Sequence, residues 1–531
     1  MQSHDIPWGP TFAEYSKRPF NPERTELSSK DAKKFFTRYG VLPLGSLESL
    51  LYEADPRRDF ASFKVPKLSD ILKIVQAYMD VTSDKVFHNY YGFLCFRHLL
   101  HSTCLAVLKE TGLLVQMHDT LRRFKSWESM ASAVAYQVLE LAGAAAAGGK
   151  AELDKLDPIF DSPNCAINTY HGDTNLLMIT DILWEDRDSL LTLTLNGLLP
   201  GIGVLLMLVG FHMFPQVTST RSLDFLYLQD LASRLYLIGS LRDRQICMLL
   251  CGTGMERGLE WKYGEQRFVS ADDSHKVANA YLRLFEVYSD HRESLPIIPV
   301  AFMHYIYNFV QQVVAQNPSV PIYELIEVAH TSLKFLWLFF EVLENLKVNL
   351  HLPTRAYATF CFFSLGFIQK RLQSPEDQYM LVEVLSGAEF VALAGRVLLL
   401  VTAEANDCEF MDGLDMLIAI LGQLDSTVSR SVGTAPSLFA GSGVEHAKVA
   451  HQIKLSEALQ PSRSRSNSGL KGLLNKMIRT WSQFDGSLGD NIAGNPYQGC
   501  AYPRCFEPYD SEIKLRKLPT RALGNENVRR T

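Results

Sequence analysis

Apolar residues recur at helical spacing from residue 28 to about residue 424, and the alternating pattern of β-strands is nearly absent over this range. In the segment KLSDILKIVQAYM, for example, Leu68, Ile71, Leu72 and Val75 fall on one face of a helix. The sequence therefore predicts an all-α fold. We expect more than half of residues 28–424 to be helical and no sheet of three or more strands to form.

Many of these predicted helices are apolar over more than half of their circumference, as in residues 333–346 and 357–368. Such helices need neighbours on two sides. Stacked helical pairs of the HEAT or armadillo type would provide them, so a multi-helix array of this kind is our architectural hypothesis, although no motif repeats at a fixed period. Helix starts are also marked, most clearly by the serine cap, first-turn proline and acids of residues 374–377.

Composition shifts divide the chain into four parts. We expect an extended N-terminal arm (1–27), a helical body (28–424) with a break near residues 142–165, a flexible Ser/Gly/Pro linker (425–470), and a short helix with a disordered tail (471–531). The linker ends in PSRSRSNSG, where three serines lie beside two arginines. Ser464, Ser466 and Ser468 are therefore candidate phosphorylation sites, and a plain solvated linker is the alternative.

The run from Leu190 to Phe214 contains no Asp, Glu, Lys or Arg and is long enough to span a bilayer. Pro200 and Gly201 interrupt it near the middle. We therefore predict two buried helices that meet at this point. The alternative is a membrane-associated helical protein that uses residues 190–214.

The formal net charge of −6 provides no basic footprint for a phosphate backbone, so we expect no nucleic-acid partner. The nine cysteines are scattered and mostly lie in apolar runs, which is typical of reduced thiols in a cytoplasmic or nuclear protein. The N-terminus has no basic region followed by an apolar segment and does not resemble a signal peptide.

Catalytic and ligand-binding motifs are weak. The glycines of CGTGMERG (251–258) have the wrong spacing for a dinucleotide loop and are better explained as a helix end with a turn. A three-ligand metal site formed by His98, His101 and Cys104 on a single helix has poor geometry, and core or surface histidines are the better explanation. Asp186 and Asp188 in WEDRD have the pattern of a solvated helix end. We therefore expect no cofactor, no small-molecule ligand and no catalytic residue, and an enzyme site assembled from distant helices is the alternative.

The C-terminal segment from Met477 to Cys505 contains Trp481, Phe484, the pair Leu488-Gly489 and the element CAYPRC. This series resembles the start of the MYND-type zinc finger that closes many uncharacterised basidiomycete fungal proteins. In that family a helical body precedes the finger. Upstream, ILWEDR (182–187) and PGIGVLL (200–206) also look like the body of such proteins.

The resemblance implies zinc bound by seven cysteines and a histidine, or a close variant, in an intact finger. Here Cys500 and Cys505 form a finger-like pair, but the 26 residues that follow contain no cysteine and no histidine. Because structural zinc needs four ligands, we expect an incomplete site without bound zinc. Two explanations stay open: a vestigial finger, or a gene model that reads through an intron or shifts frame.

Together these observations predict a non-catalytic helical scaffold or protein-interaction protein related to MYND-finger proteins. Intact MYND fingers generally bind short proline-containing peptides, so the resemblance implies protein partners. The biological process and the identity of those partners do not follow from the sequence.

Overall fold

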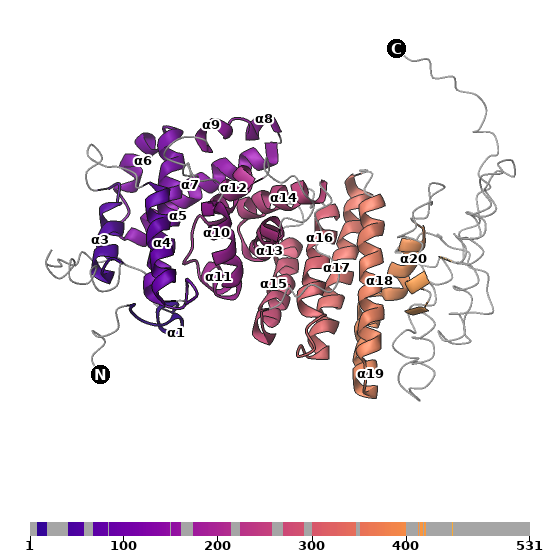
Figure 1. Cartoon of the computed structure of the whole chain (residues 1–531). Coiled ribbons are helices and arrows are strands. Elements are labelled where there is room, and N and C mark those ends of the chain that lie inside the picture. Colours follow the sequence, from indigo (N-terminus) through magenta and orange to yellow (C-terminus); the bar gives the residue numbers. More distant parts are fainter. Residues whose placement is uncertain are drawn as a thin grey trace, which may run out of the picture. The chain divides into compact units, whose positions relative to one another are not determined.

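A computed structural model describes residues 8–17, 41–57, 67–82, 84–148, 150–160, 174–213, 223–256, 269–290, 300–346 and 351–399, and single positions at 413, 415–417, 419–420 and 449 (Figure 1). The chain divides into two compact units. Unit 1 comprises residues 1–284 and 312–317, and unit 2 comprises residues 285–311 and 318–531.

The helices of unit 1 are α1 (Phe12–Tyr15), α3 (Leu44–Glu53), α4 (Leu68–Thr82), α5 (Tyr90–Glu110), α6 (Leu113–Leu121), α7 (Trp127–Gly148), α8 (Lys150–Leu153), α9 (Asp157–Phe160), α10 (Thr174–Glu185), α11 (Arg187–Leu195), α12 (Ile202–Met213), α13 (Leu223–Ile238) and α14 (Leu241–Glu256). Helices α15 (Ala271–Asp290) and α16 (Val300–Val314) contribute residues to both units. Unit 2 continues with α17 (Ile322–Leu346), α18 (His351–Arg371), α19 (Pro375–Gly387) and α20 (Phe390–Leu399).

The predicted all-α fold is confirmed. Helices account for more than half of residues 28–424, and the described residues contain no strand. An isolated bridge joins Thr11 to Asn89. Sequence periodicity sufficed here because each long helix repeats its apolar positions over several turns.

Helix α5 is the central helix of unit 1. Every residue from Tyr91 to Leu108 is buried, and α3, α4, α6, α7 and α12 pack around it. Helix α14 packs on both α7 and α13. A helix that is buried all round must satisfy its polar side chains inside the protein, and this requirement positions the polar groups described below.

The described part of the N-terminal arm differs from the extended arm predicted for residues 1–27. Residues 12–15 form α1, which begins with a capping box between Thr11 and Glu14. Tyr15 is buried, and its hydroxyl donates a hydrogen bond to the carbonyl of Phe87. Trp8 packs edge-on against Tyr78 at a centroid distance of 5.5 Å. These aromatic partners hold the segment against unit 1.

The apolar run 190–214 is divided as predicted. Helix α11 ends at Leu195 and α12 begins at Ile202, and every residue from Ile202 to Gly210 is buried. Gly201 has φ +89°, and a Cβ at this position would lie 2.7 Å from Cys104 Sγ. The turn therefore needs glycine for two reasons, its left-handed backbone and its close approach to α5.

Helix α7 extends to Gly148, beyond the start of the break predicted near 142–165, and the short helices α8 and α9 follow. It is the one described helix that is long and apolar enough to cross a membrane, and half of its most apolar window is buried. Core helices of soluble proteins meet the same criterion, so α7 is weak evidence for a membrane span.

Unit 2 is built around α17, which packs against α18, α19 and α20. The ring of Tyr357 on α18 lies edge-on to Phe339 on α17 at 4.9 Å. Trp337 Nε1 donates a hydrogen bond of 2.8 Å to the carbonyl of Ala388. The predicted start of α19 is confirmed, because Ser374 Oγ accepts a hydrogen bond of 3.0 Å from Asp377 N.

Candidate functional site

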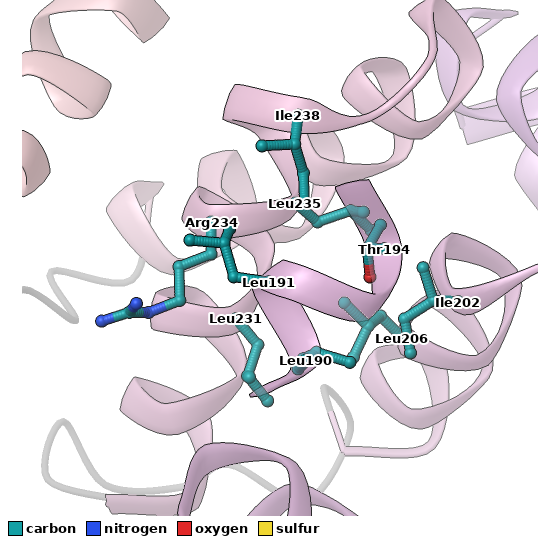
Figure 2. Close-up of a pocket in the computed structure, with 9 residues that line it drawn as sticks. All are labelled: Leu190, Leu191, Thr194, Ile202, Leu206, Leu231, Arg234, Leu235 and Ile238. Atoms are coloured by element: carbon teal, nitrogen blue, oxygen red, sulfur yellow. The ribbon is translucent and has the colours of Figure 1, made fainter. Parts of the chain in front are cut away.

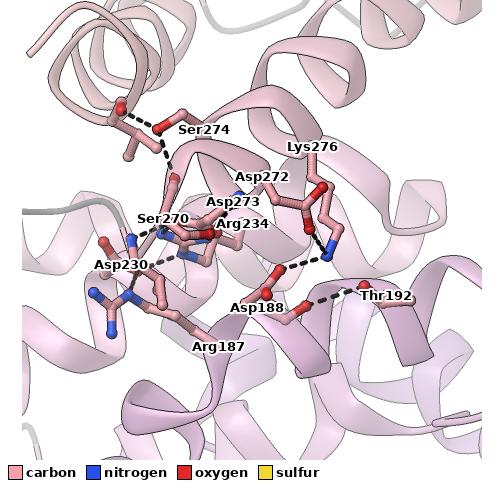
Figure 3. Close-up of polar contacts among 12 residues, drawn as sticks. Arg187, Asp188, Thr192, Asp230, Arg234, Ser270, Asp272, Asp273, Ser274 and Lys276 are labelled. Carbon is pink, nitrogen blue, oxygen red and sulfur yellow. Dashed lines mark hydrogen bonds and ion pairs between the residues drawn. The ribbon is translucent and has the colours of Figure 1, made fainter. Parts of the chain in front are cut away.

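Four buried charged side chains from three helices of unit 1 form a cluster (Figure 3). Arg234 on α13 contacts Asp230, one turn earlier on the same helix, with 2.7 Å between Nε and Oδ1. Its two terminal nitrogens donate to Asp273 on α15. Arg187 on α11 lies further away, with 4.0 Å between its Nε and Asp230 Oδ1. Asp230 and Asp273 are fully buried.

The charges of this cluster balance, with two arginines against two aspartates. Burial alone would lower the pKa of Arg234, but Asp230 and Asp273 outweigh it and raise the pKa above its usual value. Burial lowers the pKa of Arg187, and Asp230 offsets part of this shift. The Arg187 guanidinium also stacks over Trp184, 3.9 Å from the ring centroid.

The side chains of the cluster contact one another and thereby connect α11, α13 and α15. Asp273 Oδ2 also accepts a hydrogen bond of 2.9 Å from Val269 N, which fixes the chain entering α15. At its exposed edge, Lys276 bridges Asp188 and Asp272 with two contacts of 2.7 Å (Figure 3). The buried charges therefore link three helices of unit 1 through side-chain contacts.

A small hollow lies beside the cluster, between α11, α12 and α13 (Figure 2). It is surrounded mainly by leucine and isoleucine side chains, including Leu190, Leu206 and Ile238. Thr194 and Arg234 are the polar residues of its lining, and the guanidinium of Arg234 is already engaged by two aspartates. The hollow is too small to hold a ligand, and its lining offers little to orient a polar one.

Asp186 is not the solvated helix end that the sequence suggested. Its side chain is 3% exposed, and Oδ2 accepts a hydrogen bond of 2.8 Å from Phe87 N. Burial raises the pKa of its carboxyl, and bonds from Ser189 and Phe87 oppose the shift. The prediction was wrong because the neighbour that buries Asp186 comes from a segment 99 residues away.

The histidines of α5 are core residues. His98 and His101 are 3% and 4% exposed, and burial lowers their pKa values to about 4 and about 3. His101 Nε2 lies 3.1 Å from the carbonyl of Ala54. A carbonyl can only accept a hydrogen bond, so Nε2 carries the proton and the neutral ring keeps Nδ1 as an acceptor.

Arg97 on the same helix is also buried, and it is bound rather than mobile. One terminal nitrogen donates to the carbonyl of Leu198, and the other lies 2.6 Å from Glu128 Oε1. Its guanidinium carbon is 5.2 Å from the Trp127 ring centroid. Arg97 therefore connects α5 to α7 and to the turn before α12.

Five cysteines lie in the described part of the chain, and all are buried free thiols: Cys95, Cys104, Cys247, Cys251 and Cys361. Burial raises the pKa of Cys247 and Cys361 well above the usual value. The burial of these five thiols confirms the prediction that the cysteines pack as small apolar core residues. Among the described residues, no three His, Cys, Asp or Glu side chains are grouped so that they could hold a metal ion.

The other predicted site residues lie outside the described residues. These are the finger-like pair Cys500 and Cys505 and the candidate phosphorylation sites Ser464, Ser466 and Ser468. Of the predicted linker 425–470, the structure describes Val449, which is helical and buried. A Cβ at Gly395 on α20 would lie 2.2 Å from Val449 Cγ2, so the two residues are in close contact.

A second candidate site is a row of aromatic side chains on α18. Phe363 and Phe367 are 37% and 41% exposed, and Phe360 is half-buried. At about 100° per residue, the three rings point within about 60° of one another around the helix axis. We call Phe360, Phe363 and Phe367 the α18 stripe.

Both sides of the α18 stripe are already packed. On one side, Ser364 Oγ accepts a hydrogen bond from Gln311 on α16, and the His304 ring lies 4.1 Å from that of Phe360. On the other side, a Cβ at Gly366 would lie 2.4 Å from Met416 Sδ. The predicted neighbours on two sides are thus confirmed for α18, and the stripe between them faces solvent.

Sequence reasoning missed both the charged cluster and the α18 stripe. The cluster residues are spread from Arg187 to Asp273, and the i, i+4 spacing of Asp230 and Arg234 does not indicate that Arg187 and Asp273 join them. The stripe had a signal, phenylalanine at positions i, i+3 and i+7, but the helix also carries apolar residues on its other faces. Which face stays exposed depends on where its neighbours lie.

Comparisons with known proteins identify no relative: no protein-family model, no curated protein and no solved structure matches this chain.

Proposed function

We propose that this chain is a non-catalytic helical protein that binds other proteins, and that the α18 stripe is a docking surface. The observation that carries the proposal is the exposure of Phe363 and Phe367 on a helix whose two sides are already packed. Aromatic side chains are enriched in protein–protein interfaces, where a few of them provide most of the binding free energy.

The exposed area of these two rings is large enough to matter. A phenylalanine can bury roughly 200 Å², so the exposed fractions of 37% and 41% correspond to roughly 80 Å² of apolar surface per ring. At about 25 cal/mol per Å², covering each ring would contribute about 2 kcal/mol. The spacing i, i+3, i+7 suits a partner that presents apolar side chains along a helix.

The composition and the C-terminal resemblance support the same class of function. The net charge of −6 suits protein partners better than nucleic acid. The likeness of residues 477–505 to fungal MYND-finger proteins favours a cytoplasmic or nuclear interaction protein, although Cys500 and Cys505 supply only half of a zinc site. The proposal does not require a metal.

The test is site-specific cross-linking of the full chain in cells. A photoreactive phenylalanine analogue at position 367 should cross-link to one defined protein partner. The double variant Phe363→Ser/Phe367→Ser should weaken binding of that partner at least about tenfold, as expected from losing the contacts of two rings.

The matched control is Tyr379→Ser, which removes another exposed ring, 40% exposed, from α19 of the same unit. It should bind the partner as the parent chain does. Equal binding by the parent and the double variant, with both folded by circular dichroism, would reject the α18 stripe as the docking surface.

A further inference from the structure

Residues 8–16 pack on unit 1 in the manner of a bound peptide, and we call them the docked segment. Thr11 forms an isolated antiparallel bridge with Asn89. Beside it, Phe12 N donates a hydrogen bond of 3.0 Å to the carbonyl of His88. The main chain of the docked segment therefore pairs with the turn that enters α5, as an added strand pairs with the edge of a sheet.

The start of α5 supplies two further donors to the docked segment. The first amides of a helix have no acceptor within the helix. Here Tyr90 N donates to the carbonyl of Pro10 at 2.9 Å. Tyr91 N donates to the carbonyl of Trp8 at 3.0 Å. Unit 1 thus presents two fixed donors and one acceptor, the His88 carbonyl, to the main chain of a short peptide.

Aromatic side chains add selectivity to this pairing. The Trp8 ring packs edge-on to Tyr91 with 5.4 Å between the centroids. Tyr15 is buried and stacks on Phe93 at 5.0 Å. Its hydroxyl donates to the carbonyl of Phe87. We call the residues of unit 1 that make these contacts the α5 docking surface: Tyr78, Phe87, His88, Tyr90, Tyr91 and Phe93.

The conformation of the docked segment restricts its sequence. Gly9 has φ +73°, and a Cβ at this position would lie 3.2 Å from both Leu44 Cδ2 and Tyr90 Cβ. Glycine is therefore needed here for its left-handed backbone and for the close approach. Ala13 is exposed, so its side chain adds nothing to the contact. The contacts select a tryptophan followed directly by a glycine, with a tyrosine six residues after the glycine.

The docked segment is held by a limited set of contacts. Two of its nine residues, Tyr15 and Ser16, are buried, and the other seven are half-buried or exposed. A segment with few buried side chains opens locally at a lower free-energy cost than the core of its domain. Its departure leaves the aromatic rings and main-chain donors of the α5 docking surface open to another peptide.

We propose that the α5 docking surface is a peptide-recognition site, which residues 8–16 occupy as a built-in ligand until a segment of the same chemistry from another protein replaces them. Main-chain hydrogen bonds provide affinity in this mode of recognition, and side-chain contacts provide specificity. A second copy of this chain gains no contact by exchanging identical segments, whereas another protein adds contacts outside the segment. The site lies in unit 1 and is independent of the α18 stripe.

The test uses the full chain with a protease recognition sequence inserted between Lys17 and Arg18 and cut after folding. The probe is the acetylated peptide of residues 8–17, WGPTFAEYSK, with a fluorophore on Lys17, which is exposed. Fluorescence anisotropy should show that the probe binds the cut chain one-to-one. It should bind the uncut chain at least about tenfold more weakly, because the tethered segment competes. Equal affinity for the two forms, or no binding to a cut chain that keeps its helical circular dichroism, would overturn the proposal.

Variants of the probe assign binding to the contacts in the structure. Gly9→Ala should weaken binding to the cut chain at least about tenfold, because alanine is strained at this φ. Tyr15→Phe should weaken it several-fold through loss of the hydrogen bond to the Phe87 carbonyl. Ala13→Ser is the matched control and should bind as the parent probe does. Equal affinities of the Gly9→Ala and Ala13→Ser probes would place the probe elsewhere and contradict the proposal.

Hydrogen exchange of the uncut chain tests the same contact without cutting. Gly9→Ala in the full chain should speed exchange of the Tyr90 and Tyr91 amides at least about fivefold, because their acceptors leave with the docked segment. The amides of Leu99 and Leu100, in the buried middle of α5, should keep their rates. Equal acceleration of all four amides would show that the docked segment opens only when unit 1 unfolds, and would overturn the proposal. A dimer of the uncut chain that forms with increasing concentration would assign the exchange to a second copy, and would overturn replacement by another protein.

Discussion

Replacing Asp273 by alanine should destabilise unit 1 by about 3–5 kcal/mol, the range expected when one partner of a buried ion pair is removed. Asp273 is fully buried and accepts three hydrogen bonds, two from Arg234 and one from Val269 N. Its loss leaves two arginines facing the single carboxylate of Asp230, so a net positive charge remains inside the protein. It also frees the Val269 amide at the start of α15.

The loss of stability should depend on which hydrogen bonds the substituted side chain can still accept. Asp273→Asn retains a neutral acceptor for Val269 N and should cost less than alanine, about 1.5–3 kcal/mol, because only the charge-assisted part of the contacts is lost. Lys73→Ala is the matched control. It also removes one partner of an ion pair, but Lys73 and Asp70 are 72% and 65% exposed, and a pair of this kind contributes little.

The assay is urea denaturation combined with hydrogen exchange of peptides from α13 and from residues 271–284 of α15, which reports on unit 1 separately from unit 2. The destabilisation should persist at about 1 M salt, because buried pairs are screened much less than exposed ones. A loss below about 1 kcal/mol for Asp273→Ala, or a loss equal to that of Lys73→Ala, would refute the view that this buried cluster holds the three helices together.

Four further variants and one metal analysis test other parts of the structure. Thermal denaturation should show that Gly201→Ala destabilises unit 1 by about 2–3 kcal/mol. The control Gly197→Ala is also at positive φ, but no atom lies within 4 Å of its added Cβ. It should therefore lower the free energy of unfolding by only about 1 kcal/mol. His98 and His101 have pKa values lowered to about 4 and about 3, so the unfolded chain takes up protons before the folded one. The urea midpoint should therefore fall as pH drops from about 6.5 towards 4, and less steeply in His98→Gln; a pH-independent midpoint would contradict their burial as neutral rings. Ser374→Ala should destabilise α19 by about 1 kcal/mol, seen as faster hydrogen exchange in its first turn, through loss of the cap. Metal analysis of the purified chain should find no tightly bound zinc, and one zinc per chain would show that other ligands complete the C-terminal cysteine pair.

Local features of the structure followed from the sequence wherever the cause is local. The break at Pro200–Gly201 was predictable because proline and glycine restrict the backbone in ways that do not depend on distant residues. The start of α19 was predictable because Ser374 and Asp377 satisfy amide groups only three residues away. The MYND-like resemblance of the C-terminal region stays a prediction.

The sequence by itself determined that this chain is helical, because apolar periodicity and end signals act within a few turns of each helix. Tertiary structure alone decided which polar and aromatic residues matter. The sequence pattern predicted a solvated Asp186, but its carboxylate accepts a hydrogen bond from the backbone amide of Phe87 in the core. The second aspartate that Arg234 contacts, Asp273, lies 39 residues away on another helix. Phe363 and Phe367 are exposed because the neighbours of α18 cover its other faces. Burial depends on the positions of all neighbouring helices, and a one-dimensional pattern does not contain those positions.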